Sequence, residues 1–200
     1  MPRITRDSLL SHKAYLDQRN EWRQTVIPFK KLRTVLIGNN ASLMFENELT
    51  VRYQLQEMIR VDKSMAADDL EHELAIYNEL VPTRHCLKAT LMFEFVDADV
   101  RTTKLDQMLG VEHAIWMNVN HLGKRYATPN RMLGEPSGDR VSSVYFLSFQ
   151  LEDADVADFI AGEPVALGID HPAYNHSVDE ISPQTQSVLI EDLKSSSQAS

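Results

Sequence analysis

Two glutamates stand at positions where the helical periodicity predicts apolar neighbours. Residues 47–61 read as a helix, and a step of about 100° per residue puts Glu57 at the edge of its apolar face. A second predicted helix, residues 68–80, carries Glu73 inside the sector of its buried stripe. A carboxylate among apolar side chains must be protonated, paired or metal-bound, because leaving it uncompensated costs several kcal/mol. Glu73 is therefore the first candidate for a chemical role.

Polar side chains on neighbouring segments could pair with these carboxylates. Arg52 and Arg60 lie on the first helix, and Lys88 and Thr90 share the polar face of an alternating strand predicted over residues 87–96. One interpretation is a structural salt-bridge network that fixes the helix pair on the sheet. The other is a pocket for a small ligand. The candidate pocket residues are Arg52, Gln54, Glu57, Glu73, Tyr77, Lys88, Thr90 and Tyr174.

A metal centre is an alternative use of the same carboxylates. Asp170, His171 and His176 follow a short predicted strand, and all three are competent metal ligands. If Glu57, Glu73 and His171 converged, they would offer the mixed carboxylate and imidazole donors that suit one transition-metal ion. The plain alternative is that His171 ends the strand and His176 lies in a solvated tail.

Several strong catalytic signatures are missing from the sequence. The chain has no phosphate-binding Gly-rich loop, no Gly-x-Ser-x-Gly elbow and no Cys-x-x-Cys pair. His72 and Glu73 begin like a zinc-protease motif, but Ile76 occupies the position of the second histidine. The Glu-x-x-His pairs of carboxylate-bridged di-iron bundles do not occur either. The sequence therefore excludes these mechanisms as a basis for function.

Charge and composition indicate the cellular compartment of the protein and the classes of partner it is expected not to bind. A formal charge of −9 argues against a general nucleic-acid binder, and no run of about 18 apolar residues predicts a membrane span. The first residues lack the apolar stretch of a secretory signal, and Cys86, the single cysteine, cannot form an internal disulfide. We therefore expect a cytoplasmic protein that binds neither nucleic acid nor membranes.

The charge is unevenly distributed along the chain. Residues 1–33 carry eight basic and three acidic side chains, a formal +5, which leaves −14 for the rest of the chain. An anion-binding arm would explain this pattern. A basic helix that docks on its own acidic body explains it equally well.

The order of predicted elements indicates the α+β class. We predict a mixed, mainly antiparallel sheet flanked by helices in a single domain, because helices and strands do not alternate in strict βαβ order. That domain covers residues 1–176, and residues 177–200 form a polar, flexible tail with at most a short helix near 184–193. The remaining predicted elements are helices at 7–24, 99–109 and after Asp153, a hairpin at 34–37 and 42–45, strands at 115–119, 141–151 and 165–169, and a loop at 129–140.

The same residues resemble a bacterial family known as domain of unknown function 3501. The resemblance covers the chain up to about His176, and Glu79 departs from it where the family has a proline. Members tend to be encoded near rubrerythrin-like and iron–sulfur oxidoreductase-like proteins, which implies a role in redox or oxidative-stress metabolism. The residues that carry the resemblance are Phe45, Glu46, residues 50–58, Glu73, Tyr77, Asn78, Pro82, residues 88–91, Asp170, His171, Pro172 and Tyr174.

Two hypotheses about function follow. The first is an accessory or binding protein whose partner is a redox protein of the rubrerythrin-like or iron–sulfur oxidoreductase-like kind. The second is an enzyme that depends on a single transition metal held by Glu57, Glu73 and His171.

Overall fold

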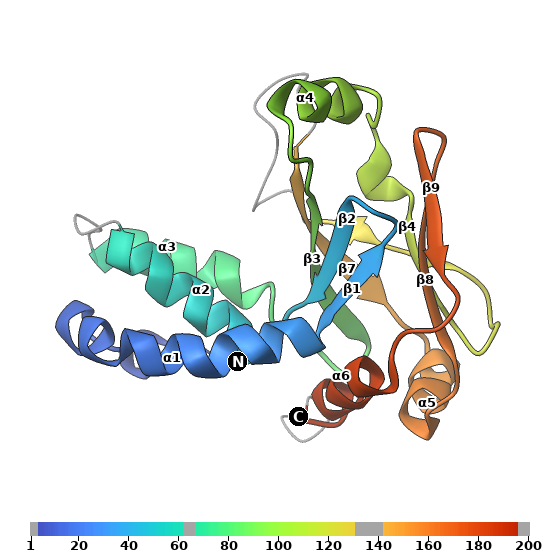
Figure 1. The fold of residues 1–200 in the computed structure, drawn as a ribbon. Helices are drawn as coiled ribbons and strands as arrows, with labels where there is room; N and C mark the ends of the chain where they lie inside the picture. The colour runs from blue at the N-terminus through green and yellow to red at the C-terminus, as the bar shows by residue number, and fades with distance from the viewer. Residues whose placement is uncertain (1–3, 62–66, 131–141, 196–200) are drawn as a thin grey trace.

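The described part of the chain has helices near both of its ends, and its strands form two antiparallel sheets (Figure 1). The structure is a computed structural model that describes residues 4–61, 67–130 and 142–195. The helices are η1 (Arg6–Ser8), α1 (His12–Leu32), α2 (Glu48–Val61), α3 (Ala67–Asn78), α4 (Ala98–Asp106), η2 (Val111–His113), α5 (Asp153–Ala161) and α6 (Pro183–Ser195). The strands are β1 (Thr34–Ile37), β2 (Ala41–Phe45), β3 (Cys86–Phe93), β4 (Ile115–Val119), β5 (Arg125–Tyr126), β6 (Thr128–Pro129), β7 (Val144–Gln150), β8 (Val165–His171) and β9 (Tyr174–Val178).

The two sheets confirm the predicted α+β class. The first sheet has the order β1-β2-β3-β7-β6, and the second has the order β5-β4-β8-β9. All of these neighbours pair antiparallel. The predicted hairpin forms β1 and β2, and Gly38 takes a positive φ of 68° in its turn, a conformation that costs glycine little. The predicted strands are therefore present, but they divide between two sheets.

The main core lies between these sheets. The alternation of β3 puts Leu87, Ala89 and Leu91 on one buried face, as the sequence predicted. Val165 and Leu167 of β8 belong to the same apolar cluster from the side of the second sheet. The two inner faces together therefore remove a continuous apolar surface from water, which is the main stabilising contribution to such a fold.

A layer of helices covers the opposite face of the first sheet. Val51, Leu55 and Leu74 from α2 and α3 form a second apolar cluster, against which Phe146 of β7 packs. Figure 1 shows α1, α2 and α3 together on this side of the sheet. Thr90, which the alternation placed on a polar face of β3, is consequently only 6% exposed. Thr90 on the polar face of this strand is therefore covered, whereas Lys88 and Met92 on the same face stay partly exposed.

Helix α1 is longer than the sequence predicted. We expected a helix over residues 7–24, whereas α1 begins after Ser11, whose side chain accepts a hydrogen bond of 3.3 Å from the Ala14 amide. The helix continues through Pro28 to Leu32. Proline removes one backbone donor and disfavours a helix interior, but Val26 is fully buried beside it. Tertiary packing thus maintains the last turns where local propensity predicted an end.

The fold also extends beyond the predicted domain boundary at residue 176. Strand β9 crosses that position, and α6 then buries Leu189 and Leu193 in the main core. The sequence predicted a short helix near 184–193, but the polar composition of the segment concealed that Leu189 and Leu193, four residues apart on one face, pack in the core. The end of β9 and α6 therefore occupy residues where a flexible tail was predicted, and α6 overlaps the short helix that the sequence allowed near 184–193, while residues 196–200 lie outside the described residues. Most of the predicted loop at 129–140 also lies outside them.

Replacing Leu189 by alanine tests whether α6 belongs to the core. We expect Leu189→Ala to lower the free energy of unfolding by about 2 to 5 kcal/mol, because it leaves a cavity in a fully packed site. Ser187→Ala on the exposed side of the same helix is the matched control, with a change within about 0.5 kcal/mol. Urea unfolding followed by circular dichroism measures both. Equal effects of the two substitutions would contradict the assignment of α6 to the core.

Candidate functional site

Glu57 joins α2 to α1. The Tyr15 hydroxyl donates a hydrogen bond of 2.6 Å to one carboxylate oxygen of Glu57, and Arg19 donates to both oxygens at 2.7 and 2.9 Å. Arg60, a partner predicted from the sequence, donates at 3.3 Å. The hydrogen bond from Arg19 lowers the pKa of Glu57 to about 2, although partial burial opposes the shift. Glu57 is therefore a permanent carboxylate that fixes α1 on α2.

The sequence did not identify the partners of Glu57 on α1. Tyr15 and Arg19 lie four residues apart in the basic segment at the start of the chain. This spacing puts both side chains on one face of a helix, and it was the feature of the sequence that could have identified them as partners of a carboxylate. Arg52, which was expected near the glutamates, instead pairs with Glu48 on its own helix. The Arg19 contact shows that part of the basic segment docks on an acidic group of the same chain.

Glu73 lies at the contact between α2 and α3. It is half-buried, and the nearby Tyr77 forms a side-chain hydrogen bond with Gln54. Burial, followed by the negative charge of Glu73, raises the pKa of Tyr77. Three of the predicted pocket residues therefore do lie together, at a helix–helix contact.

Glu46 is a buried carboxylate that sequence reasoning did not select. It follows β2 and is 1% exposed, and it accepts hydrogen bonds from the hydroxyls of Thr50 and Thr90 at 2.5 and 2.6 Å. The Thr90 hydroxyl is therefore bound to Glu46. The candidate pocket residues consequently do not all lie together. The feature of the sequence that could have identified Glu46 is its position directly after the apolar run of residues 41–45, where a carboxylate needs a partner.

Arg33 and Asp192 form a buried ion pair close to Glu46. Arg33 is fully buried, and it also donates a hydrogen bond of 3.2 Å to the Phe45 carbonyl. Asn47, at the start of α2, donates to the other carboxylate oxygen of Asp192 at 3.5 Å. Burial raises the pKa of Asp192 to about 6, against the attraction of Arg33. The pair joins the end of α1 to α6, and neither residue was among the sequence candidates.

The remaining pocket candidates lie within the sheets. Lys88 donates a hydrogen bond of 2.9 Å to the hydroxyl of Ser148, its cross-strand partner on β7. The Tyr174 hydroxyl on β9 donates to the Ile37 carbonyl at 2.7 Å and accepts from the Asn40 amide at 3.0 Å. Tyr174 thus connects the second sheet to the turn of the first hairpin. The structure does not gather these side chains with Glu57 and Glu73 into one pocket.

The predicted metal ligands are likewise separated. His171 ends β8, where one ring nitrogen lies 3.1 Å from the Leu109 carbonyl and the other accepts from the Ala173 amide at 3.2 Å. Among the residues that the structure describes, no group of three or more His, Cys, Asp or Glu side chains could hold a metal ion. The set of Glu57, Glu73 and His171 is therefore not assembled, because these side chains bind within their own parts of the fold.

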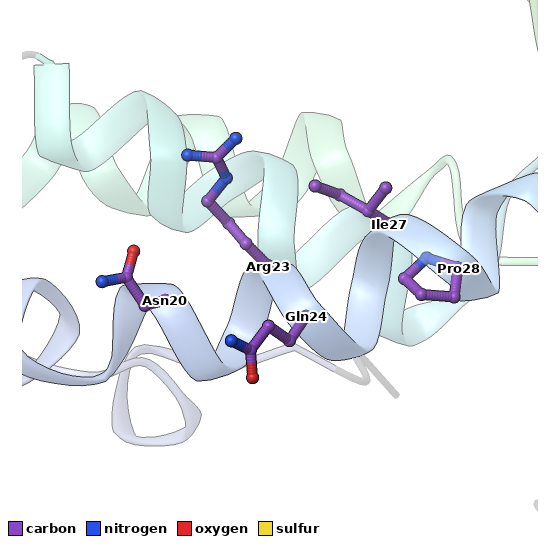
Figure 2. A pocket seen from close by; sticks show the side chains of 5 residues that line it. All are labelled: Asn20, Arg23, Gln24, Ile27 and Pro28. Carbon is purple, nitrogen blue, oxygen red and sulfur yellow. The ribbon is translucent and has the colours of Figure 1, made fainter.

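One face of α1 is left exposed to solvent. Its side chains form what we call the outer stripe, which consists of Lys13, Leu16, Asn20, Arg23, Ile27 and Lys31. Leu16 and Ile27 are 48% and 41% exposed. An open depression of 510 Å³ lies along the stripe, and Figure 2 shows its lining residues with α2 and α3 behind α1. The lining residues are Asn20, Arg23, Gln24, Ile27 and Pro28.

The outer stripe is distinct from the side of α1 that packs inward. Tyr15, Arg19 and Val26 form the inward side, and each is followed directly by a residue of the outer stripe. Successive residues of an α-helix are rotated by about 100°, so the outer stripe cannot share these inward contacts.

In the described parts of the chain, no helix combines the length and apolar character needed to span a membrane.

Neutralising Glu57 tests its role in docking α1. Because the pKa of Glu57 is about 2 in the folded protein against an ordinary 4.5, its stabilisation is present above about pH 4.5 and is lost as the pH falls towards 2. Glu57→Gln should lower the free energy of unfolding by about 1 to 2 kcal/mol at neutral pH and flatten its decline in acid. Denaturant titrations across this pH range measure both effects.

Glu48→Gln on the same helix is the control for Glu57. The side chain of Glu48 is 43% exposed and pairs only along the helix surface with Arg52, so its loss should cost less than about 0.5 kcal/mol. An acid profile of Glu57→Gln that matched the unchanged protein would contradict the role of this carboxylate.

A double-mutant cycle tests the Arg33 and Asp192 pair. Arg33→Met strands a buried carboxylate and should cost about 3 to 5 kcal/mol of unfolding free energy. Adding Asp192→Leu removes that charge, so the double variant should be more stable than the sum of the single effects by more than about 1 kcal/mol. Unfolding of the four proteins in guanidinium chloride measures the coupling. Additive single effects would show that the two side chains do not interact.

The fold of this chain is similar to that of a protein of known structure. A crystal structure of a novel protein of unknown function from Burkholderia pseudomallei is similar to this chain with a TM-score of 0.89 and 38% sequence identity, over 96% of this chain and 99% of that chain. No curated protein matches the chain. Residues 3–193 match the family described as protein of unknown function, DUF3501, so the resemblance seen in the sequence is confirmed. This chain belongs to the DUF3501 family of proteins of unknown function.

Proposed function

We propose that this protein is an accessory protein that binds a redox protein through the outer stripe of α1. The single observation that carries the proposal is the exposure of Leu16 and Ile27 on the longest helix, where Ile27 lines an open depression of 510 Å³. Large apolar side chains that gather on one exposed surface are typical of protein interaction sites.

The interior of the molecule supports binding over catalysis. Glu57 and Thr90, two of the candidate pocket residues, fix helices to each other or to the first sheet. Lys88 and Tyr174 bind within and between the sheets. The polar side chains thus build a scaffold, and a scaffold of this kind keeps an exposed helix such as α1 in a fixed orientation for a partner.

The class of partner in this proposal comes from the family. The resemblance noted from the sequence implies that members of this family are encoded near rubrerythrin-like and iron–sulfur oxidoreductase-like proteins, so the partner we propose is a redox protein of one of these kinds. The protein would then act by contact with this partner in redox or oxidative-stress metabolism.

Capture from the native host tests this function. Tagged protein should enrich a rubrerythrin-like or iron–sulfur oxidoreductase-like protein, and the purified partner should then bind the purified chain in calorimetry. The variant L16D/I27D places charge on the outer stripe and should abolish both results. V96D/V100D is the matched control, because Val96 and Val100 are also exposed apolar residues but lie near and on α4. Absence of any redox protein from the enriched fraction would contradict the proposal.

A further inference from the structure

We infer that the outer stripe binds an acidic amphipathic helix of the partner, an inference that rests on the proposed function and adds the chemistry of the bound segment. The stripe runs along a helix of 21 residues, which is long enough to offer a partner helix several turns of contact. Its members follow one another at intervals of three and four residues, the spacing at which side chains line a helix–helix contact.

The positive charge of the stripe favours a partner segment with acidic side chains. Lys13, Arg23 and Lys31 are all exposed members of the stripe, whereas the acidic residues Asp17 and Glu21, which are also exposed, lie beside it on the flank of Gln24 and Pro28. The stripe itself therefore carries three cationic side chains and no carboxylate, and the exposed charged residues of α1 together keep a net positive charge. Opposite charges across an interface steer association and fix the register, so glutamates or aspartates on the partner fit these positions.

The apolar residues of the stripe favour a partner helix that carries a row of apolar side chains along one face. Leu16 and Ile27 stand eleven positions apart, or about three helical turns, and cations lie before, between and after them. Beside Ile27, the open depression provides room for an apolar side chain of the partner. A segment that combines apolar residues at helical spacing with flanking acidic residues would match both features.

A second copy of the chain fits this surface less well. In an antiparallel pairing of two α1 helices that brings Leu16 next to Ile27, Lys13 of one copy would meet Lys31 of the other. A parallel pairing would bring each of these cations against its own counterpart. Like charges in contact disfavour both arrangements.

An anionic membrane is also a poorer match. Basic amphipathic helices that lie on membranes rely on a broad apolar face, whereas this stripe has two large apolar residues, Leu16 and Ile27. The whole chain carries a formal charge of −9, which would be repelled by anionic headgroups. A protein helix needs only the local charge of the stripe to be complementary.

A peptide titration tests the inference without any redox protein. The probe is a fluorescently labelled synthetic helix with leucines at helical spacing and glutamates beside them, and its binding is measured by anisotropy. We expect R23E/K31E to weaken binding at least about tenfold, and added salt to weaken binding to the unchanged protein, because exposed charges are screened. A peptide with lysines in place of the glutamates should not bind the unchanged protein.

The matched control reverses the same number of charges elsewhere. Arg101 and Lys104 are exposed on α4, so R101E/K104E changes the net charge by the same amount and should alter peptide binding less than about twofold. Because all four residues are exposed, both variants should keep the unfolding free energy of the original chain, which urea titration verifies. An equal loss of peptide binding in both variants would overturn the inference.

The other occupants of the surface give distinct results. Sedimentation showing a dimer that R23E/K31E dissociates, or phosphatidylglycerol vesicles that bind the chain when the acidic peptide does not, would each overturn the inference. Failure of the peptide to bind overturns the inference alone, because the capture of a redox protein is measured separately. Conversely, capture without any redox protein contradicts the proposed function and leaves the peptide result standing.

Discussion

A fully buried guanidinium, that of Arg33, holds together two parts of the chain that lie 159 positions apart in sequence. A charge without access to water must be neutralised within the protein, and Asp192 of α6 supplies the opposite charge. Arg33 also donates a hydrogen bond to the Phe45 carbonyl at the end of β2, so the helices at the two ends of the chain and the first sheet meet at one point.

The docking of the helical layer follows from this junction. Directly after β2, Glu46 accepts hydrogen bonds from Thr50 of α2 and Thr90 of β3, which sets the start of α2 against the sheet. Farther along α2, Glu57 then receives Arg19 and Tyr15 of α1. Glu46, Glu57 and Asp192 thus each join two different elements, and together they leave the outer stripe as the side of α1 without such a role.

Prediction from the sequence succeeded where local periodicity decides the outcome. The alternation of β3 and the hairpin around Gly38 are present in the structure, and so is the pair of helices that carries Glu57 and Glu73. It failed where distant contacts override local preference. Helix α1 continues through Pro28, and α6 packs in the core although its segment is rich in polar residues.

The sequence by itself determined the class of fold, the family, and the presence of carboxylates that need partners, because residue type and spacing are local properties. Only the tertiary structure decided which partners those carboxylates have, since Arg19 and Asp192 reach their positions through the packing of whole helices. The same packing decided which face of α1 is exposed. A one-dimensional pattern can show that a helix has two faces, but only the arrangement of its neighbours determines which face meets the solvent.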